Sequence, residues 1–448
     1  MTSQHTNRII LKTIAFIGIF LILYSGMATV FSNNPDFRIY QSIHGFYEEP
    51  AGTLQGVYIG SSNCYAFWNA LVAWEKYGLT VFPYSTPSMP FYATEYIIRE
   101  VRKTQPDAVF IINVNHLDFD DMSASHIHHL TDYMPNSELK TELREHLCDL
   151  LGLSRWDRLE FDMPWMRMRQ TWWLYLEEGL APKLDGMKAA CYYENYLSRV
   201  FDMTHRYRHN DQRAPLSDNQ TACLEQLLDF CEAEAVPVTF VSVPRGERSG
   251  ESLGRINTAC DIIRDRGFTL LYLTDEVDAV HLDLRQDFYE TKHTNIHGSI
   301  KFTDYLSKYL IETYGLRDLR GDATYQSWDE GWARYRAILA PFVLDFELGV
   351  DQRDYALAMP RGVKIETRPD GQVNMRWSPV RHAEGYCIYY RAGERGVWQQ
   401  LTTTETCACE GVAAEPGIPY YYTIVPVREV DGKTLYGNFS VNGHRVLL

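Results

Sequence analysis

Ser62 is the residue whose position in the sequence best suits covalent chemistry. It follows a short β-rich run at residues 54–59 and the dipeptide Gly60-Ser61, and it comes directly before a helical pattern. A serine at such a turn exposes its hydroxyl, and the start of the next helix offers backbone N–H groups to a developing oxyanion. Serine is also a common helix N-cap, so the position alone does not identify a nucleophile.

A histidine suited to activate Ser62 lies before the last helical pattern of the same region. His293 closes the run 290–293, which begins with Glu290, and Asp287 stands three residues before that run. A serine nucleophile needs a base, and the base needs a carboxylate that fixes its tautomer. Glu290 has the offset to fold back onto Nδ1 of His293, and Asp287 is the second candidate. A capping or surface role is the alternative for a histidine at a helix start.

Strand and helix patterns alternate around both residues. The alternation predicts an α/β fold with a parallel sheet between layers of helices, whose active site lies at the carboxyl ends of the strands. A helical insertion, rich in aromatic residues and methionine, interrupts it at residues 115–215. The β-rich runs cover 54–59, 80–84, 108–114, 236–243 and 268–273, and the helical patterns cover 63–77, 91–103, 217–235, 249–266 and 296–314.

The C-terminal part has a different pattern. Short alternating runs at 373–377, 386–390 and 420–425 are separated by turn dipeptides, which is typical of an all-β sandwich. The expected organisation is a cytoplasmic N-terminus with a transmembrane anchor at 1–32, a linker at 33–49, the α/β domain at 50–324, a helical connector at 325–358 and the all-β domain at 359–448.

An uncharged segment at residues 13–31 is close to the roughly 20 residues that cross a bilayer as a helix. Arg8 and Lys12 precede it and Asp36 and Glu48 come after it, so the positive-inside rule predicts a single-pass protein of the cell membrane with its large domains outside. A cleaved signal peptide and a buried core helix are the alternatives. The formal net charge of −15 weighs against binding to nucleic acid.

Two further groups of residues invite a functional interpretation. The six residues His116, Asp118, Asp120, His126, His128 and His129 contain metal-ligand types, but their spacing matches no standard site, and we expect no metal and no other cofactor. Tryptophans 156, 165, 172 and 173 suit either a sugar-binding cleft or, as the alternative, a hydrophobic lid or helix packing. The nine scattered cysteines do not predict a disulfide framework.

The order of the two site segments resembles the SGNH (GDSL-like) hydrolase superfamily. The similarity lies in Gly60-Ser61-Ser62, in the run 290–293, in the stretch 287–310 and in the run 131–135, and it covers about residues 50–315. Exported, membrane-anchored members from Gram-positive bacteria are the most similar in pattern. The chain departs from the family in Ser61, where the family has Asp, and in Glu290, where the family's triad has Asp.

The resemblance implies a flavodoxin-like three-layer fold and serine acyl hydrolysis or transfer without a metal. It also implies oxyanion donors after the second and third strands, for which Ser85 (or Thr86) and Asn115 (or Asn113) are the candidates. The expected substrate is an acyl ester of a cell-envelope glycan or teichoic-acid-like polymer, with a membrane-bound acyltransferase as a candidate partner. A degenerate core that serves in binding or assembly is the alternative.

The C-terminal segment resembles a fibronectin type III domain. The similarity lies in the runs 373–380, 383–390 and 417–424, in which Trp377 and a tyrosine pair have the positions of core anchors. Such modules space or bind other domains and do not catalyse, so the resemblance places the chemistry in the α/β domain.

Overall fold

The structure is a computed structural model of the whole chain. The residues that it describes are 2–31, 39–118, 120–163, 184–190, 199–207, 211–246, 250–274, 276–339, 357, 359–393, 398–430, 433–437 and 443–447.

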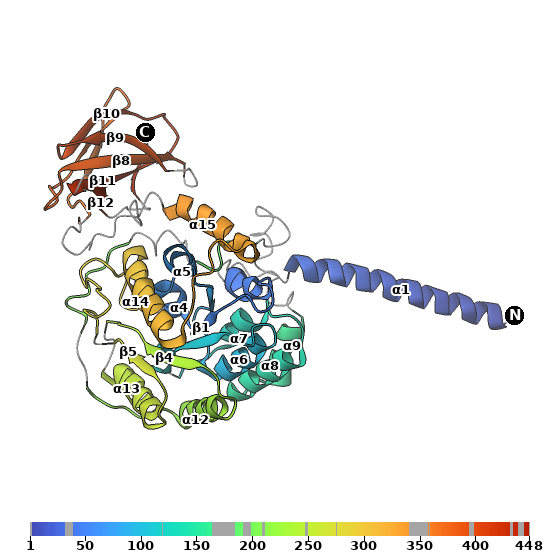
Figure 1. Cartoon of the computed structure of the whole chain (residues 1–448). Helices are drawn as coiled ribbons and strands as arrows, with labels where there is room; N and C mark the ends of the chain where they lie inside the picture. Colours follow the sequence, from blue (N-terminus) through green and yellow to red (C-terminus); the bar gives the residue numbers. More distant parts are fainter. Residues whose placement is uncertain are drawn as a thin grey trace.

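A five-stranded parallel sheet forms the centre of the larger part of the chain (Figure 1). Its order is β2-β1-β3-β4-β5, so β1 lies between two neighbours that both follow it in sequence. The α/β prediction with a parallel sheet is confirmed. The four strands β1 to β4 are buried along their whole length, as expected for a sheet covered on both faces. The strands are β1 (Gly56–Gly60), β2 (Val81–Ser85), β3 (Val109–Asn113), β4 (Val238–Ser242) and β5 (Leu270–Tyr272).

Two groups of helices flank this sheet. The first contains α4 (Ser62–Phe67), α5 (Ala70–Tyr77), α14 (Ile296–Tyr314) and α15 (Gln326–Leu339), which contact one another. The second contains α6 (Thr94–Arg102), α12 (Asp218–Ala233) and α13 (Gly250–Asp265). The first group matters most for the site, because α4 begins at Ser62 and α14 begins three residues after His293.

The helical pattern predicted at 63–77 is broken in the structure. Trp68 is extended, and its indole N–H donates to the Val81 carbonyl at 3.0 Å. Asn69 then caps α5 by accepting a hydrogen bond from the Val72 N–H at 3.2 Å. The prediction of one helix was wrong because this side-chain cap starts a second helix within one apolar pattern.

The segment before β1 belongs to the α/β core. A π-helix (Tyr40–His44) and the short helix α3 (Gly45–Tyr47) bury Ile39, Ile43 and Phe46. The prediction of a linker as far as residue 49 was therefore too long. The predicted linker residues 33–38 lie outside the described residues.

The insertion is helical where it is described up to residue 163. It contains α7 (Ala124–Thr131), α8 (Glu138–Leu150) and α9 (Arg155–Asp162), whereas 199–207 form no helix. Trp156 is 78% exposed, so it is not a packed lid residue. Trp165, Trp172 and Trp173 lie outside the described residues.

Helix α15 packs into the α/β domain. Trp328 is buried, Asp329 accepts a hydrogen bond from the Trp74 indole at 2.9 Å, and the Tyr335 hydroxyl accepts one from Asn69 Nδ2 at 2.6 Å. This part of the predicted connector is therefore a core element. Residues 340–356 of the connector lie outside the described residues.

The C-terminal part is all-β, as predicted, and it contains two antiparallel sheets (Figure 1). One has the order β10-β7-β6, and the other has the order β12-β11-β8-β9 with β13 paired to β11. Trp377 and Tyr386 pack edge to face in its core. The strands are β6 (Lys364–Thr367), β7 (Gln372–Arg376), β8 (Gly385–Ala392), β9 (Gln399–Thr404), β10 (Ala408–Ala413), β11 (Tyr420–Val430), β12 (Lys433–Tyr436) and β13 (His444–Val446).

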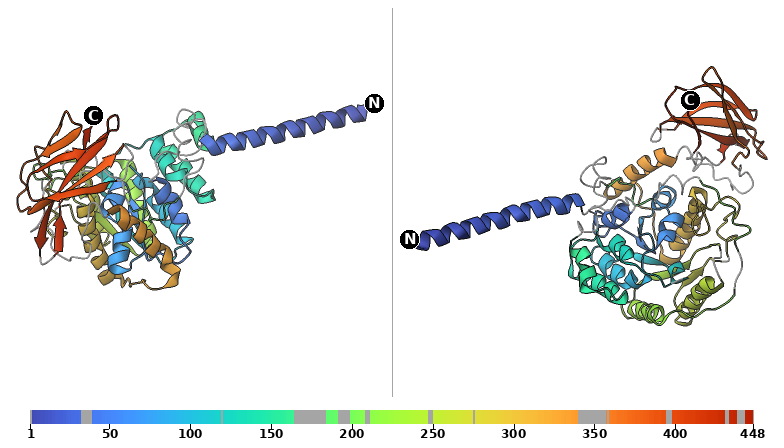
Figure 2. Two further views of the ribbon diagram at one scale, coloured as in Figure 1. Left: turned by 90° about the horizontal axis from the view of Figure 1, so that it is seen from above. Right: turned by 180° about the vertical axis from the view of Figure 1, so that it is seen from behind.

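The N-terminal helix α1 (Thr2–Phe31) extends away from the rest of the chain (Figure 2). Its stretch Arg8–Met27 has a mean hydropathy of 2.1 and is not buried by the protein. It is long and apolar enough to cross a membrane, and a signal sequence has the same length and composition. Its apolar side chains are exposed, which does not fit the buried core helix considered from sequence.

Candidate active site

Ser62, His293 and Glu290 form a hydrogen-bonded chain in the structure. The Oγ of Ser62 lies 2.7 Å from Nε2 of His293, and Nδ1 of His293 lies 2.6 Å from Oε1 of Glu290. Both distances are within hydrogen-bond reach for a nucleophile, its base and the group that orients the base. Ser62 and His293 are 231 positions apart in sequence, so the fold brings them together.

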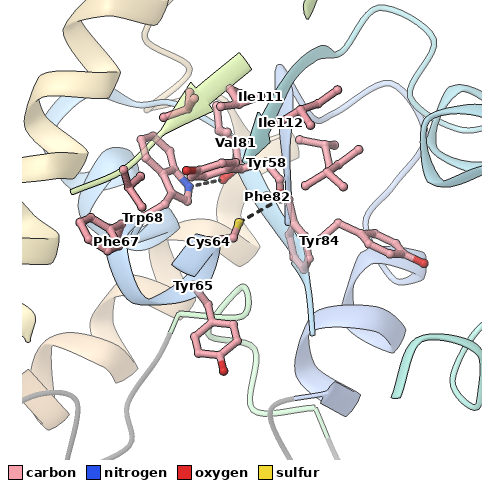
Figure 3. Close-up of a cluster of buried hydrophobic side chains, with 14 of the residues drawn as sticks. Tyr58, Cys64, Tyr65, Phe67, Trp68, Val81, Phe82, Tyr84, Ile111 and Ile112 are labelled. Atoms are coloured by element: carbon pink, nitrogen blue, oxygen red, sulfur yellow. Dashed lines mark hydrogen bonds between the residues drawn. The ribbon is translucent and has the colours of Figure 1, made fainter. Parts of the chain in front are cut away.

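The turn after β1 sets the position of Ser62. A Cβ on Gly60 would lie 2.8 Å from the Cβ of Asn113, so only glycine allows β1 to pass this close to β3. Ser61 is the N-cap of α4, and Ser62 is its first residue. Figure 3 shows Cys64 turned toward the core, where its thiol donates to the Tyr58 carbonyl at 3.2 Å. The inward Cys64 and the partly exposed Ser62 fix the orientation of this first turn.

A closed turn carries His293 and Glu290. Phe288 and Thr294 form an isolated antiparallel bridge, and the N–H of Asn295 donates to the Asp287 carbonyl at 3.0 Å. Inside the turn, the N–H of Tyr289 donates to the His293 carbonyl at 2.9 Å. Glu290 and His293 therefore lie on a short stretch whose two ends are bonded to each other.

The start of α14 is bonded to the end of α4. The Thr294 hydroxyl donates to the Ala66 carbonyl at 2.5 Å, and the Ser299 hydroxyl donates to the Phe67 carbonyl at 3.0 Å. The carbonyls in the last turn of a helix lack partners within that helix. Here the element that follows His293 satisfies two of them, which holds the histidine in register with the helix that starts at Ser62.

Asn295 caps α14. Its Oδ1 accepts from the N–H groups of His297 and Gly298, and its Nδ2 donates to the carbonyls of Arg199 and Gln286. These bonds are structural, and they explain why an asparagine stands two residues after the histidine.

Of the two candidate carboxylates, Glu290 is the one bonded to His293. Asp287 is buried and accepts hydrogen bonds from Lys301 Nζ at 2.6 Å and from the Asp283 N–H at 2.7 Å. Burial raises the pKa of Asp287, against the lowering effect of Lys301. Asp287 therefore links this turn to Lys301 of α14. The prediction of Asp287 as a second catalytic candidate is corrected, because Glu290 is the carboxylate bonded to His293.

The environment of Glu290 keeps it ionised. Burial alone would raise its pKa, but hydrogen bonds from His293, from the Lys292 N–H at 2.8 Å and from the Thr291 hydroxyl lower the pKa to about 2. An ionised carboxylate on Nδ1 favours the tautomer of His293 in which Nε2 can accept a proton from Ser62.

The oxyanion candidates are placed unequally. Both side-chain atoms of Asn115 bridge to the end of β4, where Nδ2 donates to the Val243 carbonyl at 2.9 Å and Oδ1 accepts from the Val243 N–H at 2.8 Å. The side chain of Asn113 is also engaged, with Tyr58 and with the Asn115 N–H. Each Nδ2 contact uses one of the two N–H groups that the amide carries, so the second N–H of Asn115 Nδ2 stays a predicted oxyanion donor.

The hydroxyls of Ser85, the last residue of β2, and of Thr86 are further candidates for that role. Ser85 pairs with Gly60 in the register of β1 and β2. Gly60 is two residues before Ser62 in the sequence. The hydroxyls of Ser85 and Thr86 are buried and have no hydrogen-bond partner within the described part of the chain. The backbone N–H of Ser85 is already bound to the Ser42 hydroxyl at 2.9 Å. Each hydroxyl oxygen is closed to solvent and is left unused by the described part of the chain.

A buried ionic network beside the triad was missed from sequence. Arg245 donates to Asp118 at 2.7 Å and to the Asn115 carbonyl, and Lys292 Nζ lies 3.8 Å from the same Asp118 carboxylate. The N–H of Gly246 donates to the Thr291 carbonyl at 2.6 Å. The segment after β4 therefore braces the turn that carries His293. A proline-arginine-glycine run directly after a buried strand was the available signal.

The histidine-rich segment is divided among structural contacts. His128 bonds Asp132 at 3.0 Å and stacks on Phe161, while Asp120 accepts from the hydroxyls of Tyr92 and Ser217. Among the described residues, no group of three or more His, Cys, Asp and Glu side chains is arranged to hold a metal. The eight cysteines in the described ranges are free, and Cys191 lies outside those ranges.

No protein-family model matches this chain, and no curated protein matches it. Among solved structures, an Fn3-like protein from Clostridium thermocellum is similar over 19% of this chain and 88% of its own, with 21% identity and a TM-score of 0.17. A fibronectin type III domain of human collagen XX has 21% identity over 20% of this chain and 88% of its own, with a TM-score of 0.16. A twitchin kinase region from C. elegans has 20% identity and a TM-score of 0.18, and the chain spans 16% of that structure's length.

Proposed function

We propose that this protein is a membrane-anchored serine esterase or O-acyltransferase of the SGNH type, acting outside the membrane on acyl esters of a cell-envelope polysaccharide or teichoic-acid-like polymer. The hydrogen-bonded chain from Ser62 through His293 to Glu290 carries the proposal. These three residues follow a parallel sheet flanked by helices. The resemblance to SGNH hydrolases implies a triad in the same position.

The proposed reaction has two halves. Ser62 Oγ attacks the acyl carbonyl carbon while its proton passes to Nε2 of His293, and the oxyanion forms against the Ser62 N–H and the hydroxyls of Ser85 or Thr86. The tetrahedral intermediate then expels the alcohol, which takes the proton from His293, and an acyl ester remains on Ser62. Water or an acceptor hydroxyl attacks that ester, His293 takes its proton, and the proton returns to Ser62 as the acyl group leaves.

Three features support the location and substrate class. The stretch Arg8–Met27 is long and apolar enough to anchor the chain. Arg8 and Lys12 precede the uncharged residues 13–31, which favours an outside position for the domains on the C-terminal side of that segment. The C-terminal β domain resembles modules that space or bind other molecules and would hold the α/β domain near a polymer or a membrane-bound acyltransferase.

Removing the nucleophile tests the proposal. Ser62→Ala should abolish turnover of an aryl acetate by the full-length protein in detergent, whereas Ser61→Ala, at the neighbouring cap position, should keep measurable turnover. A fluorophosphonate probe should label the wild type and the Ser61→Ala variant but not Ser62→Ala. Equal turnover of the wild type and Ser62→Ala, or no labelling of folded wild-type protein, would favour the alternative function in binding or assembly of envelope polymers.

A further inference from the structure

Asp118 is a buried carboxylate at the end of the 3-10 turn Asn115–Asp118, which follows β3. Its Oδ2 accepts from Arg245 Nη2 at 2.7 Å and from the Ser252 hydroxyl at 3.3 Å, and Lys292 Nζ lies 3.8 Å from the same oxygen. One carboxylate oxygen therefore joins the segments after β3 and β4, helix α13 and the turn before α14. Breaking such a buried ionic group by removing one partner is costly, so the group holds these segments in one arrangement.

Lys292 links this carboxylate to the acid of the triad. Its backbone N–H donates to Glu290 Oε1 at 2.8 Å, and the same oxygen lies 2.6 Å from His293 Nδ1. Its side chain is the part that faces Asp118. Because one residue makes both contacts, a shift of the Lys292 side chain away from Asp118 moves the donor that orients Glu290.

Thr291 is held in a similar way by the segment after β4. Its hydroxyl donates to Glu290 Oε2 at 3.2 Å, and its carbonyl accepts from the Gly246 N–H at 2.6 Å. Gly246 directly follows Arg245, whose guanidinium also donates to the Asn115 carbonyl at 3.3 Å. Both oxygens of Glu290 are therefore bonded to residues that the segments after β3 and β4 hold in place.

We propose that Asp118 is a positioning residue, which holds Glu290 in place through Lys292. The inference rests on the proposed function, because it assigns a role toward the same triad. Asp118 acts on the alignment of the acid and the base and not on the ester itself. Its loss should therefore lower kcat, whereas KM for a small ester should change little.

Kinetics of two single variants and their combination test this link. Asp118→Asn keeps the size of the side chain and removes its charge, so kcat for an aryl acetate, per folded molecule of full-length protein in detergent, should fall about 10- to 100-fold. Lys292→Met removes the same contact from the other partner, at a partly exposed position that favours a folded variant, and should also lower kcat. The double variant should lose no more kcat than Asp118→Asn alone, because both changes break one link.

Glu49→Gln is the matched control for lost stability. Glu49 forms another buried ion pair, with Lys188 Nζ at 2.6 Å, and it accepts from the Trp328 indole of α15. This change should lower the urea midpoint as Asp118→Asn does, while kcat and KM per folded molecule stay as in the wild type. An equal loss of kcat in Glu49→Gln would mean that any loss of stability slows the reaction, and the positioning role would be wrong.

Hydrogen exchange reports on the turn without any turnover. Peptides that cover residues 284–295 contain the Tyr289 and Asn295 N–H groups, which are bonded across the turn to the carbonyls of His293 and Asp287. These peptides should exchange faster in Asp118→Asn and Lys292→Met than in the wild type, and at the wild-type rate in Glu49→Gln.

The two measurements separate this inference from the proposed function. If the wild type turns over no ester but exchange changes as expected, the proposed function is wrong and the hold of Asp118 on the turn stands. Unchanged kcat in both single variants, additive losses in the double variant, or unchanged exchange of the turn would overturn the inference and leave the assignment of Ser62 intact.

Discussion

Glu290 and Asp287 are separated by one turn of chain but have opposite surroundings. Glu290 faces His293 and is reached by solvent, whereas Asp287 is buried and paired with Lys301 of α14. The offset of three residues from a histidine favoured Glu290 from sequence alone. The role of Asp287 could not be predicted, because it depends on where a lysine fourteen residues later lies in the folded helix.

Amide substitutions should separate the two carboxylates. Glu290→Gln keeps the side-chain size but removes the charge that orients His293, so kcat for an aryl acetate should fall on the order of 10³- to 10⁴-fold. Asp287→Asn leaves Lys301 without its partner in the core, and the free energy of unfolding should fall by about 3 kcal/mol. Turnover per folded molecule and urea unfolding measure the two effects. If Asp287→Asn lost as much kcat as Glu290→Gln while remaining folded, the assignment of Glu290 would be wrong.

The low pKa of Glu290 predicts how stability changes in acid. Its folded-state pKa of about 2 lies below the ordinary value of 4.5, so its contribution to stability is present above pH 4.5 and disappears as the pH falls toward 2. The difference in unfolding free energy between the wild type and Glu290→Gln should therefore be constant near neutral pH and shrink below about pH 4.5. Urea unfolding at a series of pH values measures it. A difference that persists unchanged to about pH 2 would contradict the hydrogen-bonded carboxylate.

At the scale of elements, the junction of α4 and α14 determines whether Ser62 and His293 meet. Alternating strand and helix patterns predicted both elements and their order. They did not predict the break at Trp68, because the apolar pattern runs through it and the partners of the freed carbonyls come from residues more than 220 positions away. Such long-range side-chain bonds have no local signature in the sequence.

Gly298, in the first turn of α14, should tolerate no side chain. In an open helix Ala is favoured over Gly by about 1 kcal/mol. Here a Cβ would lie 2.3 Å from the Asp287 carbonyl oxygen and 2.8 Å from Thr294 Cγ2. Gly298→Ala should therefore lower the free energy of unfolding by roughly 1–3 kcal/mol and reduce turnover, because the clash displaces the turn that carries His293.

Ser307→Ala is the matched control in the same helix. The Ser307 hydroxyl is buried and has no hydrogen-bond partner among the described residues, so its removal should leave stability unchanged or slightly increased. Urea unfolding of both variants makes the comparison. Stabilisation by Gly298→Ala would mean that the start of α14 does not press on the Asp287 carbonyl.

At the scale of the whole molecule, distant segments complete the α/β domain. Glu49 pairs with Lys188 at 2.6 Å and accepts from the Trp328 indole, which joins the segment before β1, the insertion and α15. The α/β domain was predicted to end at residue 324, where the sequence pattern changes. In the structure, helix α15 still packs into that domain. A sequence shows where composition changes, but a domain ends where its packing ends. For this reason the predicted boundaries at residues 49 and 324 both differ from the structure.

The N-terminal helix α1 should keep the protein in a membrane. Within the described part of the protein, nothing buries the apolar side chains of Arg8–Met27. Leu11 and Ile22 are both 72% exposed and Phe16 is 71% exposed, which is costly in water and favourable in a bilayer. The full-length chain should therefore remain with membranes or detergent, and a variant lacking residues 2–31 should be recovered in the aqueous phase. Its thermal midpoint should match that of the full-length chain, since Arg8–Met27 are not buried by the rest of the protein. A lower midpoint would mean that α1 packs against the globular part.

The chemistry of the anchor provides the complementary test. Ile17→Arg with Leu21→Arg places two charges in the middle of the span, at a cost of about 2.5–3.5 kcal/mol each, and should release the chain from vesicles. Ser3→Arg, outside the apolar stretch, should leave membrane association intact. Mass spectrometry of the membrane fraction should find the N-terminal residues still attached. If they are missing from the mature chain, α1 is a cleaved signal sequence, and the proposed membrane anchor is wrong.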